Sequence, residues 1–236
     1  MSSGEIDPRV LLTIRALTVA VDPENPDARV LLSAATIIRQ GGVVGCPTET
    51  LYGLAADPFN EGAVAKLQDL KKRRSPRAVI LLLPHPGAAF EVGVLKGVAR
   101  RWFDTLTRAF WPGALTLVLP KKPRLNCPAL AGGDTVAVRF SSHPVASRLA
   151  QTAGRAITST SANLTGGGAA SSCADLDPAL AFRLDLILDA GPTQGGMAST
   201  ILDLTRQRPT VLRDGAVPMD RIHQVLGFAP RSLTAA

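Results

Sequence analysis

The sequence predicts a single-domain protein of the α/β (mixed α+β) class, in which helices flank one twisted, mixed β-sheet. Three observations lead to this prediction. Helical stripes of apolar residues alternate along the chain with short apolar strands, and no segment repeats. Hydrophobic residues make up 46% of the chain but aromatic residues only 4%, so the core must be aliphatic, as in sheets covered by helices. A length of 236 residues fits one domain more easily than two.

The first half of the folded body, which we expect to begin near Val30, contains two helix patterns and two strand patterns. Apolar residues spaced by three and four predict a helix over 31–38, which a Gly-Gly pair stops. A strand follows over 43–47. A second apolar stripe predicts a helix over 64–74 whose last four residues are basic, and the apolar run 78–83 is typical of a buried strand.

The second half of the chain alternates in the same way. Apolar residues over 92–110 fit one or two helices. A polar, uncharged loop is expected from Thr158 to Ser172. The other expected elements are strands within 111–120, 135–140, 186–188, 199–204 and 210–213, a strand opening at Ile157, and helices after His143 and over 219–226.

Composition divides the chain into three parts. Residues 1–28 form an N-terminal extension, because they end in VDPENPDAR, where two prolines and several acids are typical of an extended arm. Residues 29–220 form the folded domain, and residues 221–236 a C-terminal tail.

Charge and cysteine content narrow the class of protein. The net charge of +7 favours anionic partners such as a nucleotide, RNA or phosphate. Cys46, Cys127 and Cys173 are far apart, so they predict neither a disulfide framework nor a zinc ribbon, and they suit a reducing compartment. The apolar run 78–83 is far shorter than the roughly 18 residues of a membrane span. We therefore expect a soluble, cytoplasmic protein without a membrane partner.

Three segments could carry chemistry, although the phosphate-binding loop and metal motifs are absent and we expect no metal site. Six basic residues within 66–77 could bind phosphates, or form a solvated helix end that complements the helix dipole. Ser159, Ser161 and Asn163 could offer donors to a ligand from one side of an extended segment, or satisfy a turn. Segment 47–54 could be a ligand-binding strand end or a tight glycine turn.

The chain also contains, in this order, CPTETLYGLAADPF, AVAKLQDLKKR, WPGALTLVLP, DTVAVRFSSHP, TSTSANLTG, STILDL and VLRDGA. Together these segments resemble the YrdC family of threonylcarbamoyl-AMP synthases, over roughly residues 30–217. The resemblance implies a YrdC-like fold and a nucleotidyltransferase that condenses L-threonine, bicarbonate and ATP into threonylcarbamoyl-AMP and pyrophosphate. That product serves the threonylcarbamoyladenosine modification of tRNA. Because the chain ends soon after VLRDGA, we expect the short, single-domain bacterial type.

The resemblance implies roles for individual residues. The family's catalytic tetrad corresponds to Lys71, Arg73, Ser161 and Asn163. These residues would bind ATP together with Thr135 and Arg213. The threonine substrate would be held by Thr50, Arg139 and Ser159. Physical chemistry agrees, because a triphosphate needs fixed cations and an amino-acid carboxylate suits an arginine fork.

Two positions depart from the pattern of many family members. Arg77 stands where they have an Asn that contacts ATP, and Leu82 where they have a His near threonine. Arg77 could reach a phosphate instead.

Partners and alternatives follow from the same resemblance. Mg²⁺ is expected to accompany ATP, on chemical grounds rather than from a ligand motif. The partners implied are ATP, L-threonine, bicarbonate, tRNA or double-stranded RNA, and downstream threonylcarbamoyl transferase proteins. One alternative is an RNA-binding module, which the net charge favours but the scarcity of aromatic stacking groups weakens. Another is a catalytically idle paralogue of the same fold, against which the complete tetrad argues.

Overall fold

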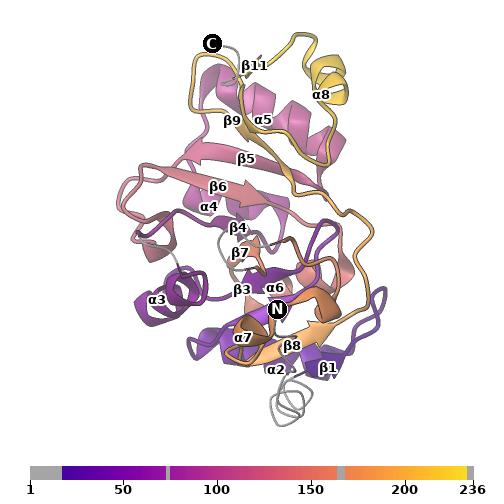
Figure 1. Cartoon of the computed structure of the whole chain (residues 1–236). Helices are drawn as coiled ribbons and strands as arrows, with labels where there is room; N and C mark the ends of the chain where they lie inside the picture. Colours follow the sequence, from indigo (N-terminus) through magenta and orange to yellow (C-terminus); the bar gives the residue numbers. More distant parts are fainter. Residues whose placement is uncertain (1–17, 73–74, 164–167, 233–236) are drawn as a thin grey trace, which may run out of the picture.

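The computed structural model describes residues 18–72, 75–163 and 168–232, and a single mixed sheet runs through them (Figure 1). Within these residues the sheet has eleven strands, in the order β1-β8-β2-β3-β7-β4-β6-β5-β9-β10-β11. The strands are β1 (Thr18–Ala20), β2 (Val44–Cys46), β3 (Gly53–Ala55), β4 (Ile80–Leu82), β5 (Leu115–Pro120), β6 (Thr135–Arg139), β7 (Ile157–Ser161), β8 (Leu186–Asp189), β9 (Thr200–Asp203), β10 (Thr210–Arg213) and β11 (Arg231–Ser232). The predicted mixed α/β class with one open sheet is confirmed.

Helices connect most of these strands. They are α2 (Ala28–Arg39), α3 (Glu61–Leu70), α4 (Ala89–Val92), α5 (Gly97–Phe110), α6 (Pro144–Ala153), α7 (Pro178–Ala181) and α8 (Met219–Leu226), with short 3₁₀ turns at Pro86–Ala88, Pro128–Leu130 and Cys173–Asp175. Among the helices of the described ranges, none combines the length and the apolarity that crossing a membrane requires.

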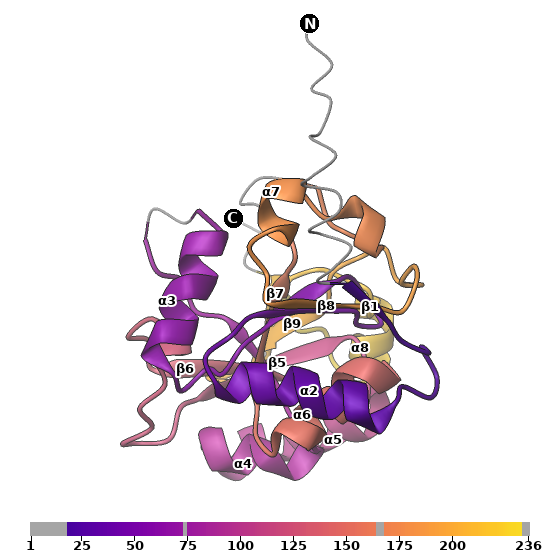
Figure 2. The same cartoon turned by 90° about the horizontal axis from the view of Figure 1, so that it is seen from below.

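The part of the sheet formed by β8, β2 and β3 is covered on both faces. Val44 and Leu188 face α2 and α6, which pack against each other. Leu54 and Ile187 face the opposite way, towards α3 and α7. Figure 2 shows this arrangement, with α2 and α6 on one side of the strands and α7 on the other. Apolar residues therefore alternate into two separate cores from the same strands.

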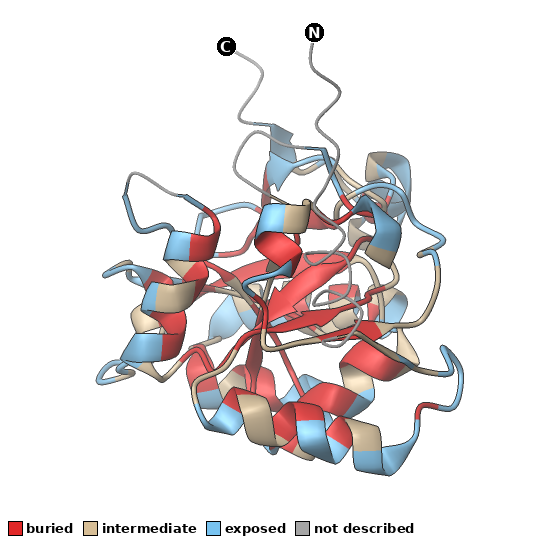
Figure 3. Ribbon diagram, turned by 60° about the horizontal axis from the view of Figure 1, so that its bottom comes forward, coloured by how far each residue is buried: buried red, intermediate tan, exposed pale blue. Residues whose placement is uncertain are grey.

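The part formed by β4, β6, β5 and β9 has its main core on one face. Leu81, Val138 and Leu202 point into this core, where they meet Phe103 and Leu106 of α5. Buried residues follow the strands and the inner sides of the helices (Figure 3). The intervening residues of these strands point to the opposite face, which carries the cavity described below.

The N-terminal edge of the sheet corrects one expectation. β1 pairs in parallel with β8, so the chain joins the sheet at Thr18, well before the expected start near Val30. The helix expected from residue 31 also begins earlier, at Ala28. The partner of β1 lies near the other end of the chain, so no local pattern indicates this strand.

Three further boundaries differ from the prediction. Helix α3 ends at Leu70, and Lys71 is its C-cap residue, so the basic run begins where the helix stops. Residues 158–161 continue β7 rather than forming a loop. Helix α8 spans the expected boundary between 220 and 221 and packs against α5. The division into extension, domain and tail stays a prediction, and the structure places both of its boundaries inside helices.

Candidate active site

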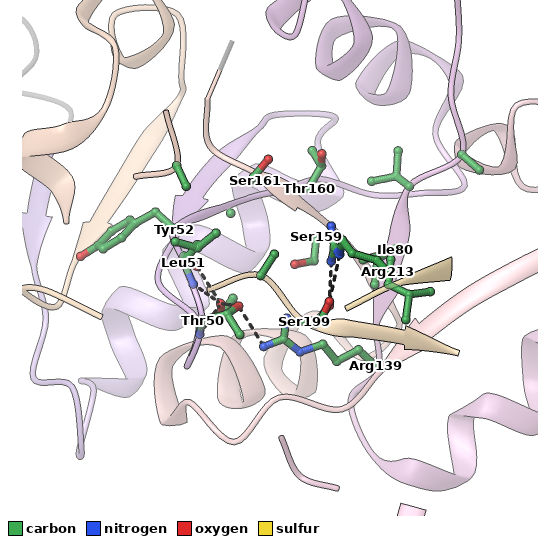
Figure 4. A pocket seen from close by; sticks show the side chains of 17 residues that line it. Thr50, Leu51, Tyr52, Ile80, Arg139, Ser159, Thr160, Ser161, Ser199 and Arg213 are labelled. Carbon is green, nitrogen blue, oxygen red and sulfur yellow. Dashed lines mark hydrogen bonds between the residues drawn. The ribbon is translucent and has the colours of Figure 1, made fainter. Parts of the chain in front are cut away.

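A cavity of about 380 Å³ opens on the face of the sheet opposite the α5 core (Figure 4). Strands β3, β4, β6, β7, β9 and β10 all contribute to it. Its polar lining residues are Thr48, Thr50, Tyr52, Arg139, Ser159, Thr160, Ser161, Ser199 and Arg213. The structure therefore gathers residues predicted for threonine and residues predicted for ATP around one space.

Strand register explains why these side chains meet. Ser159 of β7 lies opposite Ile80 of β4, and Arg213 of β10 lies opposite Ile201 of β9. Successive side chains of a strand point to opposite faces of the sheet. Since Leu81, Val138 and Leu202 fill the core, their neighbours Ile80, Arg139 and Ile201 line the cavity. In β10 a register shift between Val211 and Arg213 separates a core residue from a cavity residue.

Arg139 is the buried cation of the cavity, with only 4% of its side chain exposed. Its Nη2 donates to Thr50 Oγ1 at 3.1 Å and lies 2.8 Å from Glu49 Oε1, while its Nε donates to the Gly113 carbonyl at 3.2 Å. Thr50 Oγ1 is also 2.8 Å from the hydroxyl oxygen of Thr48. That oxygen accepts hydrogen bonds from the backbone N–H groups of Thr50 and Leu51. The segment 48–50 thus fixes the guanidinium group.

Glu49 balances the charge of Arg139 from outside the cavity lining. Its Oε2 accepts a hydrogen bond from the Ser141 hydroxyl, and its Oε1 accepts a weaker one from the Ser142 N–H at 3.4 Å. Burial raises the pKa of the Glu49 carboxyl, but the charge of Arg139 and the bond from Ser141 outweigh burial and hold this pKa below its usual value. Glu49 is therefore ionised at neutral pH.

Arg213 is the second guanidinium group of the cavity. Its Nε and Nη2 donate to the carbonyl and hydroxyl oxygens of Ser199, at 2.9 and 3.0 Å, and the Ser199 hydroxyl also bonds Thr116 Oγ1 at 2.8 Å. Burial and the nearby positive charge of Arg139 lower the pKa of Arg213. Two like charges that interact across one cavity favour the entry of an anion between them.

Lys71 forms a polar cluster with two other predicted catalytic residues. Its Nζ donates to the Ser161 carbonyl at 2.5 Å and to Asn163 Oδ1 at 2.7 Å, and the Ser161 hydroxyl also donates to Asn163 Oδ1 at 2.7 Å. Only 3% of Lys71 is exposed, so the solvated helix end is the wrong interpretation for this residue. The predicted grouping of Lys71, Ser161 and Asn163 is present in the structure.

The remaining predicted ATP residues lie elsewhere. Arg73 lies outside the described residues. Thr135 is exposed at the start of β6, opposite Pro120, and does not line the cavity. Thr135 and Arg139 lie on the same face of β6. They are four residues apart, which is about 13 Å along the strand at roughly 3.3 Å per residue. Both assignments stay predictions.

The two departures from the family pattern also lie apart from the cavity lining. Leu82 is buried in the core between α2 and α6. Arg77 is exposed, and its carbonyl accepts a hydrogen bond from Gln68 Nε2. A phosphate contact by Arg77 stays a prediction.

Comparison with known proteins places the chain in a family. Residues 36–215 match the model of the Sua5/YciO/YrdC family, which carries the description "Telomere recombination". The protein belongs to this family. The predicted membership is thus confirmed, and every predicted site residue falls inside the Sua5/YciO/YrdC match.

Two relatives in the Sua5/YciO/YrdC family carry the name threonylcarbamoyl-AMP synthase. The relative from Pyrococcus abyssi is 36% identical over 194 residues, which cover 82% of this chain and 56% of that protein. The relative from Halorhodospira halophila is 37% identical over 182 residues, which cover 77% of this chain and 88% of that protein. The chain thus spans little more than half the length of the Pyrococcus relative.

A solved structure from the same family shares the fold. The crystal structure of P. abyssi Sua5 in complex with L-threonine superimposes with a TM-score of 0.83 at 32% sequence identity. The superposition covers 92% of this chain and 63% of the Sua5 chain.

Sequence reasoning missed two side chains that hold the site together. Glu49 lies inside the quoted segment CPTETLYGLAADPF, and Ser199 opens the segment STILDL, but neither had a role. Each acts on an arginine that is distant in sequence, Arg139 or Arg213. The one available signal was that each belongs to a motif typical of the Sua5/YciO/YrdC family.

Proposed function

We propose that this protein is a threonylcarbamoyl-AMP synthase, a nucleotidyltransferase that converts L-threonine, bicarbonate and ATP into threonylcarbamoyl-AMP, pyrophosphate and water. The observation that carries this proposal is the meeting of Arg139, Arg213 and Ser161 at one cavity, with Lys71 and Asn163 bonded to Ser161 beside it. All three substrates carry negative charge, and the names of the relatives agree with this use of the cavity.

The reaction needs two bond-forming steps. The neutral amine of threonine attacks the carbon of bicarbonate, a C–N bond forms, and water leaves to give a carbamate. A carbamate oxygen then attacks the α-phosphorus of ATP, and the bond to pyrophosphate breaks. Both steps bring anions together, so the protein contributes mainly through positioning and charge stabilisation.

The threonine end of the cavity combines one cation with neutral hydroxyls. Arg139 binds the substrate carboxylate in this proposal, with Thr50 and Ser159 as the remaining polar contacts. The solved Sua5 structure with bound L-threonine supports an amino acid in this fold. Arg139 is already fixed by Thr50, so little ordering remains to be done when the substrate enters.

The ATP end consists of the Lys71 cluster and Arg213. In the proposal Lys71, Ser161 and Asn163 contact the phosphates, and Arg213 stabilises charge near the α-phosphorus. Arg73 and Thr135 complete the predicted set. Charge-assisted hydrogen bonds of this kind are about twice as strong as neutral ones.

Mg²⁺ is the expected companion of ATP. Among the described residues no group of three or more His, Cys, Asp or Glu side chains could hold a metal ion. In this proposal Mg²⁺ would enter with ATP and offset the charge of its phosphates, and no step is assigned to the ion.

The chemistry of the product, threonylcarbamoyl-AMP, suggests its use in the modification of tRNA. Threonylcarbamoyl-AMP is a mixed anhydride, which a downstream threonylcarbamoyl transferase would pass to tRNA in a cytoplasmic pathway. The basic net charge of +7 also agrees with contacts to tRNA or double-stranded RNA.

Pyrophosphate release by the purified chain tests the proposal. Release should require threonine, bicarbonate and ATP together, and mass spectrometry should find threonylcarbamoyl-AMP. Omission of either threonine or bicarbonate is the control for simple ATP hydrolysis. Pyrophosphate release that ignores both omissions, or no release at all, would contradict the proposed function.

A further inference from the structure

We propose that Glu49 is a positioning residue, which determines the nitrogen of Arg139 that meets the substrate carboxylate. The inference rests on the proposed function, because it requires an amino acid in the cavity. Glu49 does not line the cavity, whereas Thr48 and Thr50 on either side of it do. Its effect on the substrate must therefore pass through Arg139.

The contacts of the guanidinium group define what remains for a ligand. Nη2 is engaged by Glu49 at 2.8 Å and by Thr50 at 3.1 Å, and Nε is bonded to the Gly113 carbonyl at 3.2 Å. In the described part of the chain, no buried side-chain nitrogen or oxygen lacks a partner. Nη1 forms no hydrogen bond to the described residues, and because Arg139 lines the cavity, we infer that Nη1 faces it. The sequence suggested an arginine fork for the carboxylate without specifying its nitrogens, and in the structure both Nε and Nη2 already have partners.

The carboxylate of Glu49 is itself held from the far side. Ser141, which follows β6 and is almost fully buried, donates to Oε2, and the Ser142 N–H approaches Oε1. Arg139 ends the same strand. Both partners of the ion pair are thus fixed to one strand end, which limits the guanidinium group to one orientation.

Glu49 also compensates the positive charge of Arg139. Arg213 and Arg139 both line the cavity, and their positive charges repel each other. Glu49 is the carboxylate paired with Arg139 among the described residues. Without the charge of Glu49, Arg139 would be a buried cation with a like charge nearby. Its guanidinium group would then have lost the partner that compensates its charge in this orientation.

The backbone around Glu49 is held by other groups, so neutralising the side chain should not unfold it. The Thr193 hydroxyl donates to the Thr50 carbonyl at 3.1 Å. Gly195 packs so closely that a Cβ there would lie 2.4 Å from the Glu49 carbonyl oxygen. These contacts do not involve the Glu49 carboxylate.

Calorimetric binding of L-threonine and L-threoninamide to wild type, Glu49→Gln and Glu49→Ala tests the inference. Threoninamide carries a neutral amide instead of the carboxylate, so it does not use the charge of Arg139. Threonine should bind about 10-fold more weakly to Glu49→Gln and weaker still to Glu49→Ala, as typical for loss of an orienting partner. Threoninamide and ATP should bind all three proteins alike.

Asp57→Asn is the matched control. Asp57 is a buried carboxylate paired with Arg155 at 3.2 Å, and it does not line the cavity. This variant should bind threonine like wild type. In turnover, Glu49→Gln should raise the KM for threonine and leave kcat within about twofold of wild type.

The possible outcomes separate the two proposals. Equal threonine affinity in wild type and Glu49→Gln would overturn the positioning role while leaving the proposed function intact. Equal losses for threonine and threoninamide would also overturn it, because they would indicate a general structural effect. No threonine binding by wild type would overturn the proposed function, and the role of Glu49 with it.

Discussion

The two parts of the sheet differ in what covers them. Strands β8, β2 and β3 bury apolar residues on both faces, whereas β4, β6 and β9 bury one face and present Ile80, Arg139 and Ile201 of the other to the cavity. The same alternation of side chains thus gives two cores in the first part, and one core and one binding surface in the second. A sheet face that helices cover contributes to a core, and a face that stays uncovered is available for binding.

Strand β7 shows this difference between two adjacent residues. Thr158 is fully buried, where its hydroxyl donates to the Leu54 carbonyl and accepts from the Ala56 N–H. Ser159, the next residue, lines the cavity. One hydroxyl completes backbone hydrogen bonding and the other is available to a ligand.

The largest expected effect is that of Lys71→Ala. We expect pyrophosphate release to fall by about 100- to 1,000-fold, because a fixed charge near the phosphates is lost. Arg73→Ala should act in the same direction. Steady-state kinetics and thermal melting measure activity and folding separately.

Lys66→Ala on helix α3 is the matched control for Lys71→Ala. Lys66 pairs with Asp185 at 2.6 Å and lies about one-third exposed, away from the cavity. Its turnover should stay within about twofold of wild type. If Lys71→Ala were as active as this control, the phosphate-binding role of Lys71 would be wrong.

The second effect is that of Arg139→Ala on the use of threonine. This change removes the carboxylate partner and leaves Glu49 unpaired, and breaking such a pair costs about 2 to 5 kcal/mol. Threonine kcat/KM should fall by at least about 30-fold, with a smaller change in ATP affinity. Arg155→Ala, which removes the half-exposed partner of buried Asp57 outside the cavity lining, should leave both quantities unchanged. Unaltered threonine kinetics in Arg139→Ala would mean that the carboxylate binds elsewhere.

The contrast between the two parts also explains what the sequence could predict. Helix α2 follows from its own apolar stripe and from the glycines after it, because these signals are local. Strand β1 was missed because its three residues form a strand only through pairing with β8. β3 was treated as part of a turn, since it is a short Gly-Leu-Ala segment that becomes a strand between β2 and β7.

The sequence predicted several residues that the structure brings together, but not the contacts that hold them in place. The resemblance to a family located Lys71, Ser161 and Asn163, which the fold then brings into contact. Position in the sequence says nothing about the ion pair of Glu49 and Arg139, because its partners lie on separate elements. A carboxylate beside an arginine becomes meaningful only when both are buried.

The third prediction compares Thr158 and Ser159 directly. Thr158→Val should lower the free energy of unfolding by about 1 to 3 kcal/mol, since it leaves the Ala56 N–H and the Leu54 carbonyl without their partner. Its threonine KM should not change. Ser159→Ala should do the reverse, with a KM raised by about 2- to 10-fold and normal stability in urea denaturation. The same pattern in both variants would remove the distinction between the two faces of β7.

The smallest effect is the contribution of Glu49 to the pH dependence of stability. Although burial raises the pKa of Glu49, the charge of Arg139 and the bond from Ser141 lower it below the ordinary value of 4.5 in the folded protein. A carboxyl whose folded pKa is depressed stabilises the native state fully above its unfolded pKa, and this stabilisation is lost as the pH falls through the folded pKa.

The unfolding free energy of wild type should therefore fall more steeply than that of Glu49→Gln below about pH 4.3, the ordinary pKa of an unfolded Glu. The difference between the two proteins should be constant from pH 7 down to about pH 5.5, about one unit above that value. Urea denaturation at a series of pH values measures both curves, and all other carboxyl groups are common to the two proteins. Parallel curves down to pH 3 would show that the ion pair with Arg139 does not perturb the pKa of Glu49.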